Sequence, residues 1–256
     1  MESSKVFKTN EEFPNINFED LVNDFLYCPF RYEVANNTRF KVKLKNDKYI
    51  DIVLHNLLKN IHSKVNVNNK DEFFADFEIT EEDVREKIDT IINYHNLSPS
   101  YNTFTIINNV EKYWHEYGKS YKIVGDNINI LTQMKYCDLH SLIDLVIEED
   151  DGELSIAKFI GTDSNIPNIN MYKLLLNYYV YALKQFDEYK EKEFKNIYLH
   201  SLENNMRYED IPYQEELIEG ILGVLENYTK DIHDKKWRKE FDHCENCEYY
   251  GNVCRG

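Results

Sequence analysis

The sequence predicts a mixed α/β fold in which helices pack around a modest sheet. Apolar residues recur with a period near 3.6 in several stretches before residue 120 and again after residue 165, which indicates amphipathic helices. Between residues 121 and 160 the pattern changes to short apolar runs and alternation, which is typical of strands. The resulting order of helices, hairpin, helix, strand and helix favours one sheet covered by helices.

The first half of the chain is predicted to be mainly helical. A helix should begin near Phe18, because Asn17 can cap it and Asp20 lies in its first turn. It should stop at Cys28-Pro29, since proline disfavours helical geometry in the residue before it. A polar loop or short strands should follow over residues 31–49. Further helices are expected from about 50 to 62, from 80 to 92, and from Phe104 to Gly118.

The second half is predicted to carry the sheet. Strands are expected over 121–130 and 133–149, and the turn 149–153 joins the second of these to a strand at 154–160 as a hairpin. Pro167 should open a helix. Strands at about 195–202 and 206–211 should follow, and the last long helix should begin after Pro212.

Length and composition favour one domain. The 256 residues are 42% hydrophobic, and glycine and proline are few. We expect a loose leader at 1–16 and a single domain over 17–256, with a mainly helical part at 17–120, a sheet core at 121–212, and a long helix with a cysteine tail at 213–256. No apolar run reaches membrane-spanning length and no secretory signal is visible, so a cytoplasmic protein is expected.

The net charge of −16 opposes binding to polyanions. The best local exception is a basic run just before the cysteine tail, formed by Lys235, Lys236, Trp237, Arg238 and Lys239. This run is either a contact for nucleic acid or a solvated helix end, where cations suit the helix dipole.

Three cysteines close the chain, at Cys244, Cys247 and Cys254, in a C-x2-C-x6-C spacing. Such spacing can hold a metal or cluster, but it also occurs in redox pairs and in unrelated surface thiols. A closed site needs a fourth ligand, for which Cys28 is the better candidate. We favour an iron–sulfur cluster over zinc. Cys137 lies in a predicted strand and is expected to be a small buried hydrophobe.

Asp144 stands inside the apolar strand Leu142-Ile-Asp-Leu-Val-Ile147. A buried carboxylate costs several kcal/mol unless it is paired, hydrogen-bonded or bound to a metal. The alternative is a strand end from which Asp144 reaches solvent or a helix N-terminus.

These motifs together resemble the RecB-type branch of the PD-(D/E)XK nucleases, which includes AddB-type nuclease domains, CRISPR-associated exonucleases and nuclease-like ends of UvrD-type helicases. The resembling segments are Cys28-Pro-Phe-Arg-Tyr32, the helix around His55, the strand around Asp144, the stretch Asn177-Tyr-Tyr-Val-Tyr181, and the cysteine tail. The resemblance implies a restriction-endonuclease-like mixed sheet with an N-terminal helical region. It further implies that His55 and Asp144 are metal ligands, and that Cys28, Cys244, Cys247 and Cys254 hold a [4Fe–4S] cluster, with zinc as the alternative.

The sequence departs from this family at its catalytic Asp/Glu-x-Lys. Lys158 occupies the acid position and Ile160 the lysine position. His55 and Asp144 alone would bind Mg²⁺ or Mn²⁺ poorly, and the Lys158 ammonium would repel the cation. Lys158 could instead pair with Asp144, so the sequence predicts a nuclease fold with an inactive site.

Three functions remain open. The first is a non-catalytic DNA-binding or structural module of a helicase–nuclease system, contacting single-stranded DNA and a helicase partner or parent chain, with Trp237 or Tyr249 stacking on bases. The second is an active exonuclease dependent on Mg²⁺ or Mn²⁺ that recruits another acid, such as Glu148 or Asp163. The third is a purely structural partner subunit.

Overall fold

A single mixed sheet organises the computed structural model of the protein, which describes residues 14–36, 58, 62, 86, 103–160, 169–202, 207–240, 244, 247, 249–251, 253 and 254. Its strands are β1 (Asn15–Asn17), β2 (Lys122–Gln133), β3 (Asp138–Glu148), β4 (Leu154–Ile160), β5 (Phe194–Ser201) and β6 (Arg207–Pro212). The order is β1-β3-β4-β5-β6, and β2 pairs with β3. The pairs β1–β3 and β4–β5 are parallel, and the others are antiparallel.

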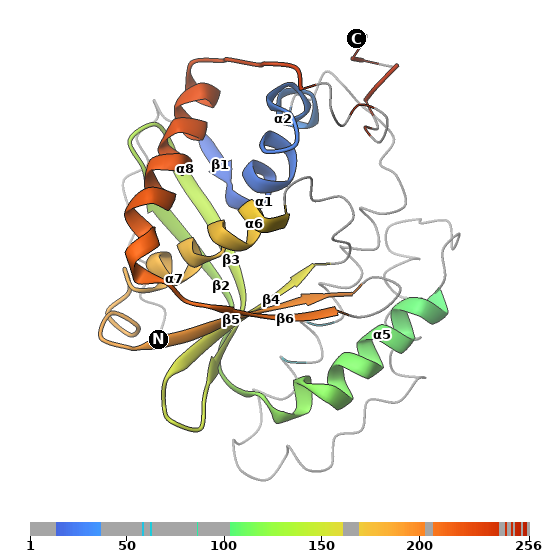
Figure 1. Ribbon diagram of the computed structural model, residues 1–256, viewed down its shortest axis with the longest axis vertical. Coiled ribbons are helices and arrows are strands. Elements are labelled where there is room, and N and C mark those ends of the chain that lie inside the picture. Colours follow the sequence, from blue (N-terminus) through green and yellow to red (C-terminus); the bar gives the residue numbers. More distant parts are fainter. Residues whose placement is uncertain are drawn as a thin grey trace.

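Strand β3 changes partner along one edge, which creates a fork in the sheet. β2 pairs with β3 from residue 138 to 148. On the other edge, β1 pairs with residues 138–140 and β4 with residues 145–148. Residues 141–144 face the gap between β1 and β4, and Figure 1 shows β3 and β4 diverging beyond their short paired stretch.

The predicted hairpin between β3 and β4 is confirmed. The Glu149 N–H donates to the Glu153 carbonyl over 2.9 Å, and Gly152 adopts a φ of 85°. A positive φ is inexpensive for glycine because it has no Cβ, which explains why the sequence Asp150-Asp-Gly152 turns here.

Helices cover both faces of the sheet. They are α1 (Phe18–Asp20), continued by the π-helix η1 (Leu21–Phe25), then α2 (Pro29–Asn36), α5 (Thr103–Glu116), α6 (Ile169–Leu175), α7 (Asn177–Leu183) and α8 (Ile218–His233), with 3₁₀ turns η2 (Gly118–Ser120) and η3 (Glu215–Leu217). α1, α7 and α8 enclose the main core, whereas α5 lies on the other side of β4–β6 (Figure 1). None of the described helices combines the length and apolar composition needed to cross a membrane.

Two N-terminal segments differ from the sequence expectation. Residues 31–36, expected as loop or strand, belong to α2, because Pro29 begins a helix as well as ending the previous one. Residues 15 and 16, expected in the leader, belong to β1, where Ile16 is buried. The expected cap is confirmed, since the Asn17 side chain accepts from the backbone N–H groups of Glu19 and Asp20. The predicted helices at 50–62 and 80–92 fall largely outside the described residues.

Candidate functional site

The fork in the sheet brings Asp144 and Lys158 together. Lys158 Nζ lies 3.3 Å from Asp144 Oδ2, and the Phe159 backbone N–H donates to the same oxygen over 2.9 Å. Both residues are buried. β4 pairs with β3 only over residues 154–157, so Phe159 has no backbone partner on β3, and its N–H donates to the Asp144 carboxylate instead. The ion pair expected from the sequence is therefore confirmed.

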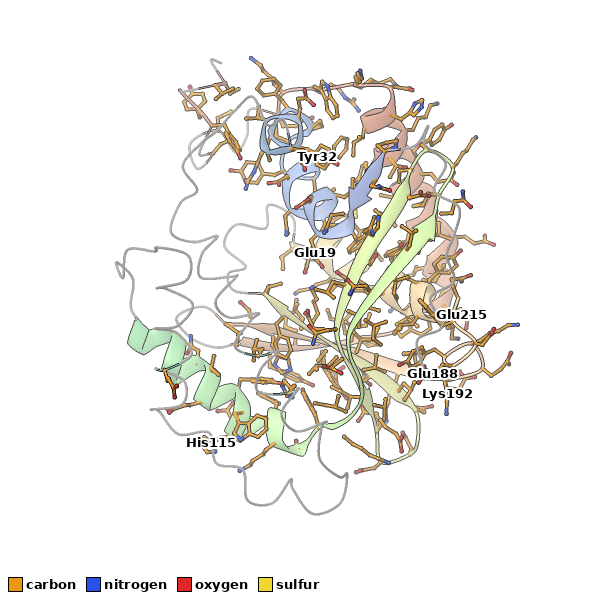
Figure 2. The ribbon with its side chains drawn as sticks, turned by 180° about the vertical axis from the view of Figure 1, so that it is seen from behind. Glu19, Tyr32, His115, Glu188, Lys192 and Glu215 are labelled. Atoms are coloured by element: carbon orange, nitrogen blue, oxygen red, sulfur yellow. The ribbon has the colours of Figure 1, made fainter. Side chains whose placement is uncertain are left out.

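Glu19 joins this pair and was missed by the sequence analysis. It comes from α1 (Figure 2), and its Oε1 lies 2.8 Å from Lys158 Nζ. The Tyr179 hydroxyl on α7 donates to the same Glu19 oxygen. The Lys158 ammonium also lies 5.5 Å from the centre of the Tyr179 ring. Four elements, α1, β3, β4 and α7, thus meet at one ammonium, and we call Glu19, Asp144, Lys158 and Tyr179 the fork cluster.

The electrostatics of the fork cluster keep Lys158 charged. Burial by itself would lower the pKa of Lys158, but the carboxylates of Asp144 and Glu19 more than offset this, so the pKa lies above its usual value. Burial, and next the Glu19 carboxylate, raise the pKa of Tyr179, so its phenol keeps the proton that it donates to Glu19. One ammonium and two carboxylates leave the cluster with a net charge near −1.

The other acids and the histidine named from the sequence do not join the cluster in the described residues. Glu148 forms an ion pair with Lys122, four residues along β3 from Asp144, which is about 13 Å at the usual strand rise. His55 and Asp163 lie outside the described residues. Within the described part of the chain, no three His, Cys, Asp or Glu side chains are grouped so that they could hold one metal ion.

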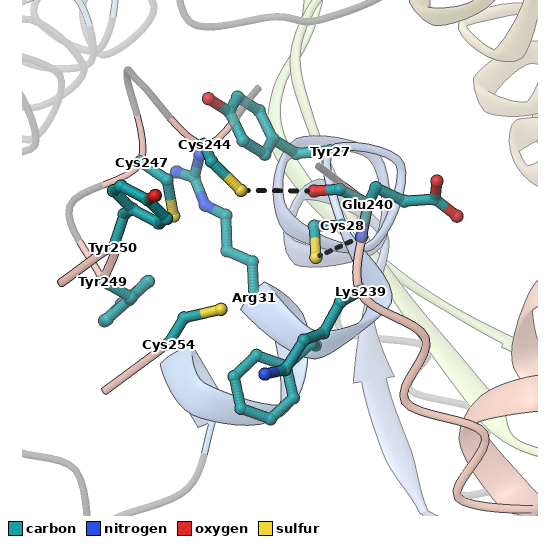
Figure 3. Close-up of a pocket in the computed structure, with 11 residues that line it drawn as sticks. Tyr27, Cys28, Arg31, Lys239, Glu240, Cys244, Cys247, Tyr249, Tyr250 and Cys254 are labelled. Carbon is teal, nitrogen blue, oxygen red and sulfur yellow. Dashed lines mark hydrogen bonds between the residues drawn. The ribbon is translucent and has the colours of Figure 1, made fainter. Parts of the chain in front are cut away.

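The four cysteines named from the sequence line a single pocket, and the first of them, Cys28, follows the C-terminal end of η1. Cys28 precedes α2, and Cys244, Cys247 and Cys254 come from the tail (Figure 3). Aromatic side chains complete much of the wall: Tyr27, Phe30, Tyr249 and Tyr250. Cys137 lies elsewhere in the core, and burial raises the pKa of its thiol to about 12, as suits a buried, unreactive cysteine.

Backbone contacts tie the two ends of the described fold together at this cysteine pocket. The Glu240 N–H donates to Cys28 Sγ over 3.4 Å, and the Cys28 thiol donates to the Arg238 carbonyl over 3.7 Å. The Phe30 N–H donates to the same carbonyl over 3.1 Å, and the Cys244 thiol donates to the Glu240 carbonyl over 3.6 Å.

The residues of the cysteine pocket suit a [4Fe–4S] cluster in kind. Four thiols and a backbone N–H directed at sulfur are the donor set that such clusters use. Four thiolates also suit a zinc ion, so zinc stays the alternative.

Most side chains of the basic run contact other groups of the protein. Lys236 and Arg238 both bind Asp231, at 3.1 and 2.9 Å, and Lys236 also binds Asp234 at 3.1 Å. One face of Trp237 stacks on Tyr32, with ring centres 6.2 Å apart. Lys239 lies over the Phe30 ring, and Lys235 adopts a φ of 55°. Local carboxylates therefore neutralise much of the charge that the sequence alone presents as a patch.

A scan against protein-family models and a search of curated proteins find no match. Among solved structures, the chain is similar to a protein from Eubacterium rectale described as "Putative exonuclease", with a TM-score of 0.50, 9% identity, and coverage of 90% of this chain and 83% of that chain. The chain therefore shares the fold of that protein. The mixed α/β sheet flanked by helices, as predicted, is confirmed, whereas the RecB-type details stay predictions. The structure of SSO0001 aligns with a TM-score of 0.39 and 14% identity over 79% of this chain and 94% of that one, which is too weak to support any conclusion.

Proposed function

We propose that this chain is a non-catalytic nuclease-fold module that serves DNA processing as a DNA-binding or structural component of a helicase–nuclease system. The observation that carries the proposal is the Lys158 ammonium, which lies 2.8 Å from Glu19 and 3.3 Å from Asp144. Lys158 thus supplies the positive charge that a bound metal cation would otherwise bring to these two carboxylates.

The chemistry of divalent cations explains why this arrangement opposes catalysis. Mg²⁺ requires near-octahedral oxygen ligands, and a neighbouring ammonium repels it. Metal-assisted phosphodiester hydrolysis needs the ion to activate water and to polarise the phosphate. Lys158 can neither activate water nor polarise the phosphate from this position, because two carboxylates neutralise its charge.

An active exonuclease is the second candidate, and Glu19 favours it. Glu19 supplies, beside Asp144, a carboxylate that the sequence analysis had not identified. A metal could use both only after Lys158 left the site. The Lys158 side chain is only 3% exposed and bound on two sides, so its departure would be costly.

We also propose a [4Fe–4S] cluster at the cysteine pocket, with zinc as the alternative. When bound, the cluster would cross-link α2 to the tail and could accept one electron. The residues that would hold it are Cys28, Cys244, Cys247 and Cys254.

The test is a cleavage and metal-binding assay on the full chain purified without oxygen. End-labelled single-stranded DNA with Mn²⁺ should stay intact, and Mn²⁺ should not raise the melting temperature of the wild type. Removing the ammonium in Lys158→Ala should free the carboxylates, so Mn²⁺ should raise the melting temperature of that variant. At a concentration 100 times Kd, a bound ligand adds about 2.7 kcal/mol to stability.

The control is the double variant Lys158→Ala/Asp144→Asn, in which the Mn²⁺ effect should disappear. Cleavage by the wild type that Asp144→Ala abolishes would overturn the proposal, as would a Mn²⁺ shift in the wild type. Retardation of intact DNA on a gel would identify a DNA-binding module, whereas its absence would identify a structural one.

A further inference from the structure

Two cationic side chains lie among the described residues of the cysteine pocket, in a chain whose net charge is −16. Arg31 and Lys239 both line the pocket, and Glu240 is the one carboxylate-bearing residue among the described residues that line it. Glu240 meets the cysteines through its backbone N–H and carbonyl, and Figure 3 shows its carboxylate pointing away from them. Among the described residues that line the pocket, the side chains directed toward the sulfurs are therefore cationic or aromatic.

Arg31 is the more deeply placed of the two cations. Its side chain is 10% exposed, and its Nε donates to Asp24 Oδ1 over 2.9 Å. Its guanidinium carbon lies 4.4 Å from the centre of the Tyr27 ring. Figure 3 shows the side chain extending among the cysteines, with the guanidinium toward Cys244 and Cys247.

The geometry of the Arg31–Asp24 pair separates the two charges with respect to the cysteines. Arg31 lines the cysteine pocket and Asp24 does not. The carboxylate takes the Nε–H, whereas the other N–H groups of a guanidinium form a planar fork on its far side. The guanidinium thus lies in the cysteine pocket, whereas the Asp24 carboxylate that binds it does not line that pocket.

A buried cation facing four thiolates has a definite electrostatic effect. Thiolates bound to a metal or cluster carry negative charge, and reduction of the cluster by one electron adds one more negative charge. A nearby fixed cation stabilises the reduced form more than the oxidised form, and net charge and hydrogen bonds at the sulfurs are known to set cluster potentials.

We propose that Arg31 is the positioning residue that balances the negative charge of the group held by the four cysteines and raises its reduction potential. The inference rests on the proposed cluster and is independent of the fork cluster. A purely structural Arg31 would only satisfy Asp24 and pack on Tyr27, and it would leave the potential unchanged.

The experiment is a reductive titration of the anaerobically purified full chain, followed through redox mediators with dithionite as the electron donor. Iron and sulfide are measured first, and the cluster signal is followed by electron paramagnetic resonance. Arg31→Gln should give a lower potential than the wild type, and Arg31→Lys should restore most of the difference. Lys239→Gln removes the exposed cation that lines the pocket, and it should lower the potential by a smaller amount.

Arg238→Gln is the matched control. It removes the same charge from a guanidinium that is 70% exposed and bound to Asp231, so its potential should equal that of the wild type. Arg31→Gln leaves the Asp24 carboxylate buried without this partner, so its melting curve is recorded too. If it does not fold, Lys239→Gln and Arg31→Lys decide the question.

The outcomes distinguish the presence of the cluster from the role of Arg31 toward it. A cluster whose potential is the same in the wild type, Arg31→Gln and Lys239→Gln overturns the role of Arg31 and leaves the cluster in place. A protein with zinc, or with neither iron nor sulfide after reconstitution, overturns both the cluster and the role of Arg31. Neither result bears on whether the fork cluster is catalytic.

Discussion

Burying the Lys158 ammonium costs free energy, and its two carboxylate neighbours offset that cost. Taking an ammonium out of water costs several kcal/mol, and removing one partner of such a pair typically costs about 3 to 5 kcal/mol. The Lys158 ammonium, on β4, binds Asp144 on β3 and Glu19 on α1. One side chain therefore links the sheet to the first helix at a point where the strands themselves have separated.

Two buried histidines form a second polar feature, on the face of the sheet covered by α5. His62 Nε2 lies 2.8 Å from the Tyr113 hydroxyl, and His200 Nε2 lies 2.9 Å from the Tyr121 hydroxyl. The Nδ1 atoms of both are buried without a hydrogen-bond partner among the described residues. Burial lowers the pKa of each histidine to about 3, and in His200 the nearby His62 adds to the effect.

These pKa values predict that stability falls in mild acid. Each histidine binds a proton near pH 6.5 when unfolded, but only near pH 3 when folded. Their contribution is complete above pH 6.5 and is lost as the pH falls toward 3. Urea unfolding at pH 7.5 and pH 5 should therefore differ, by on the order of 2 kcal/mol for each histidine.

The variant His200→Gln is the control for this pH dependence. It cannot take up a proton, so the difference between pH 7.5 and pH 5 should be about half of the wild-type value. An unchanged difference would show that His200 does not contribute to the acid sensitivity.

Contacts between individual side chains could be predicted from the sequence only where a local pattern fixes the relative positions of the residues. Asp144 and Lys158 flank a recognisable hairpin, so their pairing followed from strand register. Glu19 gave no signal, because a surface-like Phe-Glu-Asp sequence at a helix start carries no information about a contact 139 residues away. The neutralisation of Lys236 and Arg238 by Asp231 was similarly hidden, since it depends on how the chain leaves α8.

Elements were easier to predict than contacts, and their ends were the hardest part. The apolar alternation of β3 and β4 and the periodicity of α5 and α8 identified those elements directly. β1 has only three residues, too few for alternation to be visible. The sequence pattern at Pro29 predicts the end of one helix, but proline is also favourable in the first turn of a helix, and α2 begins there.

The junction between α6 and α7 depends on one buried amide. Asn177 Nδ2 donates to the Leu174 carbonyl, and its Oδ1 accepts from the Gln214 N–H, both over 3.0 Å. The side chain thus fixes α7, which carries Tyr179, to the segment that leads into α8.

Replacing this amide should destabilise the protein without changing its fold. Asn177→Leu leaves two backbone groups without their partner, so a loss of about 2 to 4 kcal/mol in the free energy of unfolding is expected. Urea denaturation measures it. Gln185→Leu removes an exposed amide–carbonyl bond from the end of the same helix and should cost under about 0.5 kcal/mol. Equal losses in the two variants would contradict the role given to Asn177.

At the scale of the whole molecule, acidic charge dominates. With 46 acidic and 30 basic residues, the long-range field repels nucleic acid. Asp231 and Asp234 also neutralise part of the basic run, because they form ion pairs with Lys236 and Arg238. Any affinity for single-stranded DNA should therefore be modest and sensitive to salt.

Releasing the basic run should strengthen that affinity. Asp231→Asn/Asp234→Asn frees Lys236 and Arg238, so binding of labelled single-stranded DNA, followed by fluorescence anisotropy, should tighten and depend more steeply on salt. Glu219→Gln/Glu226→Gln changes the net charge equally at exposed positions on the same helix. An equal effect of both double variants would locate DNA binding outside the basic run.

The contact between residues 28–30 and 238–240 also has a mechanical meaning. Cys28 and Phe30 bind the backbone of Arg238, and Glu240 binds Cys28, so strands β2 to β6 lie within a loop whose two ends are joined by these bonds. Tension applied between the two flanks of the loop would act first on these few bonds and leave β2 to β6 unstretched. A covalent link at the same place would close this loop, and β2 to β6 would then bear no load until that link broke.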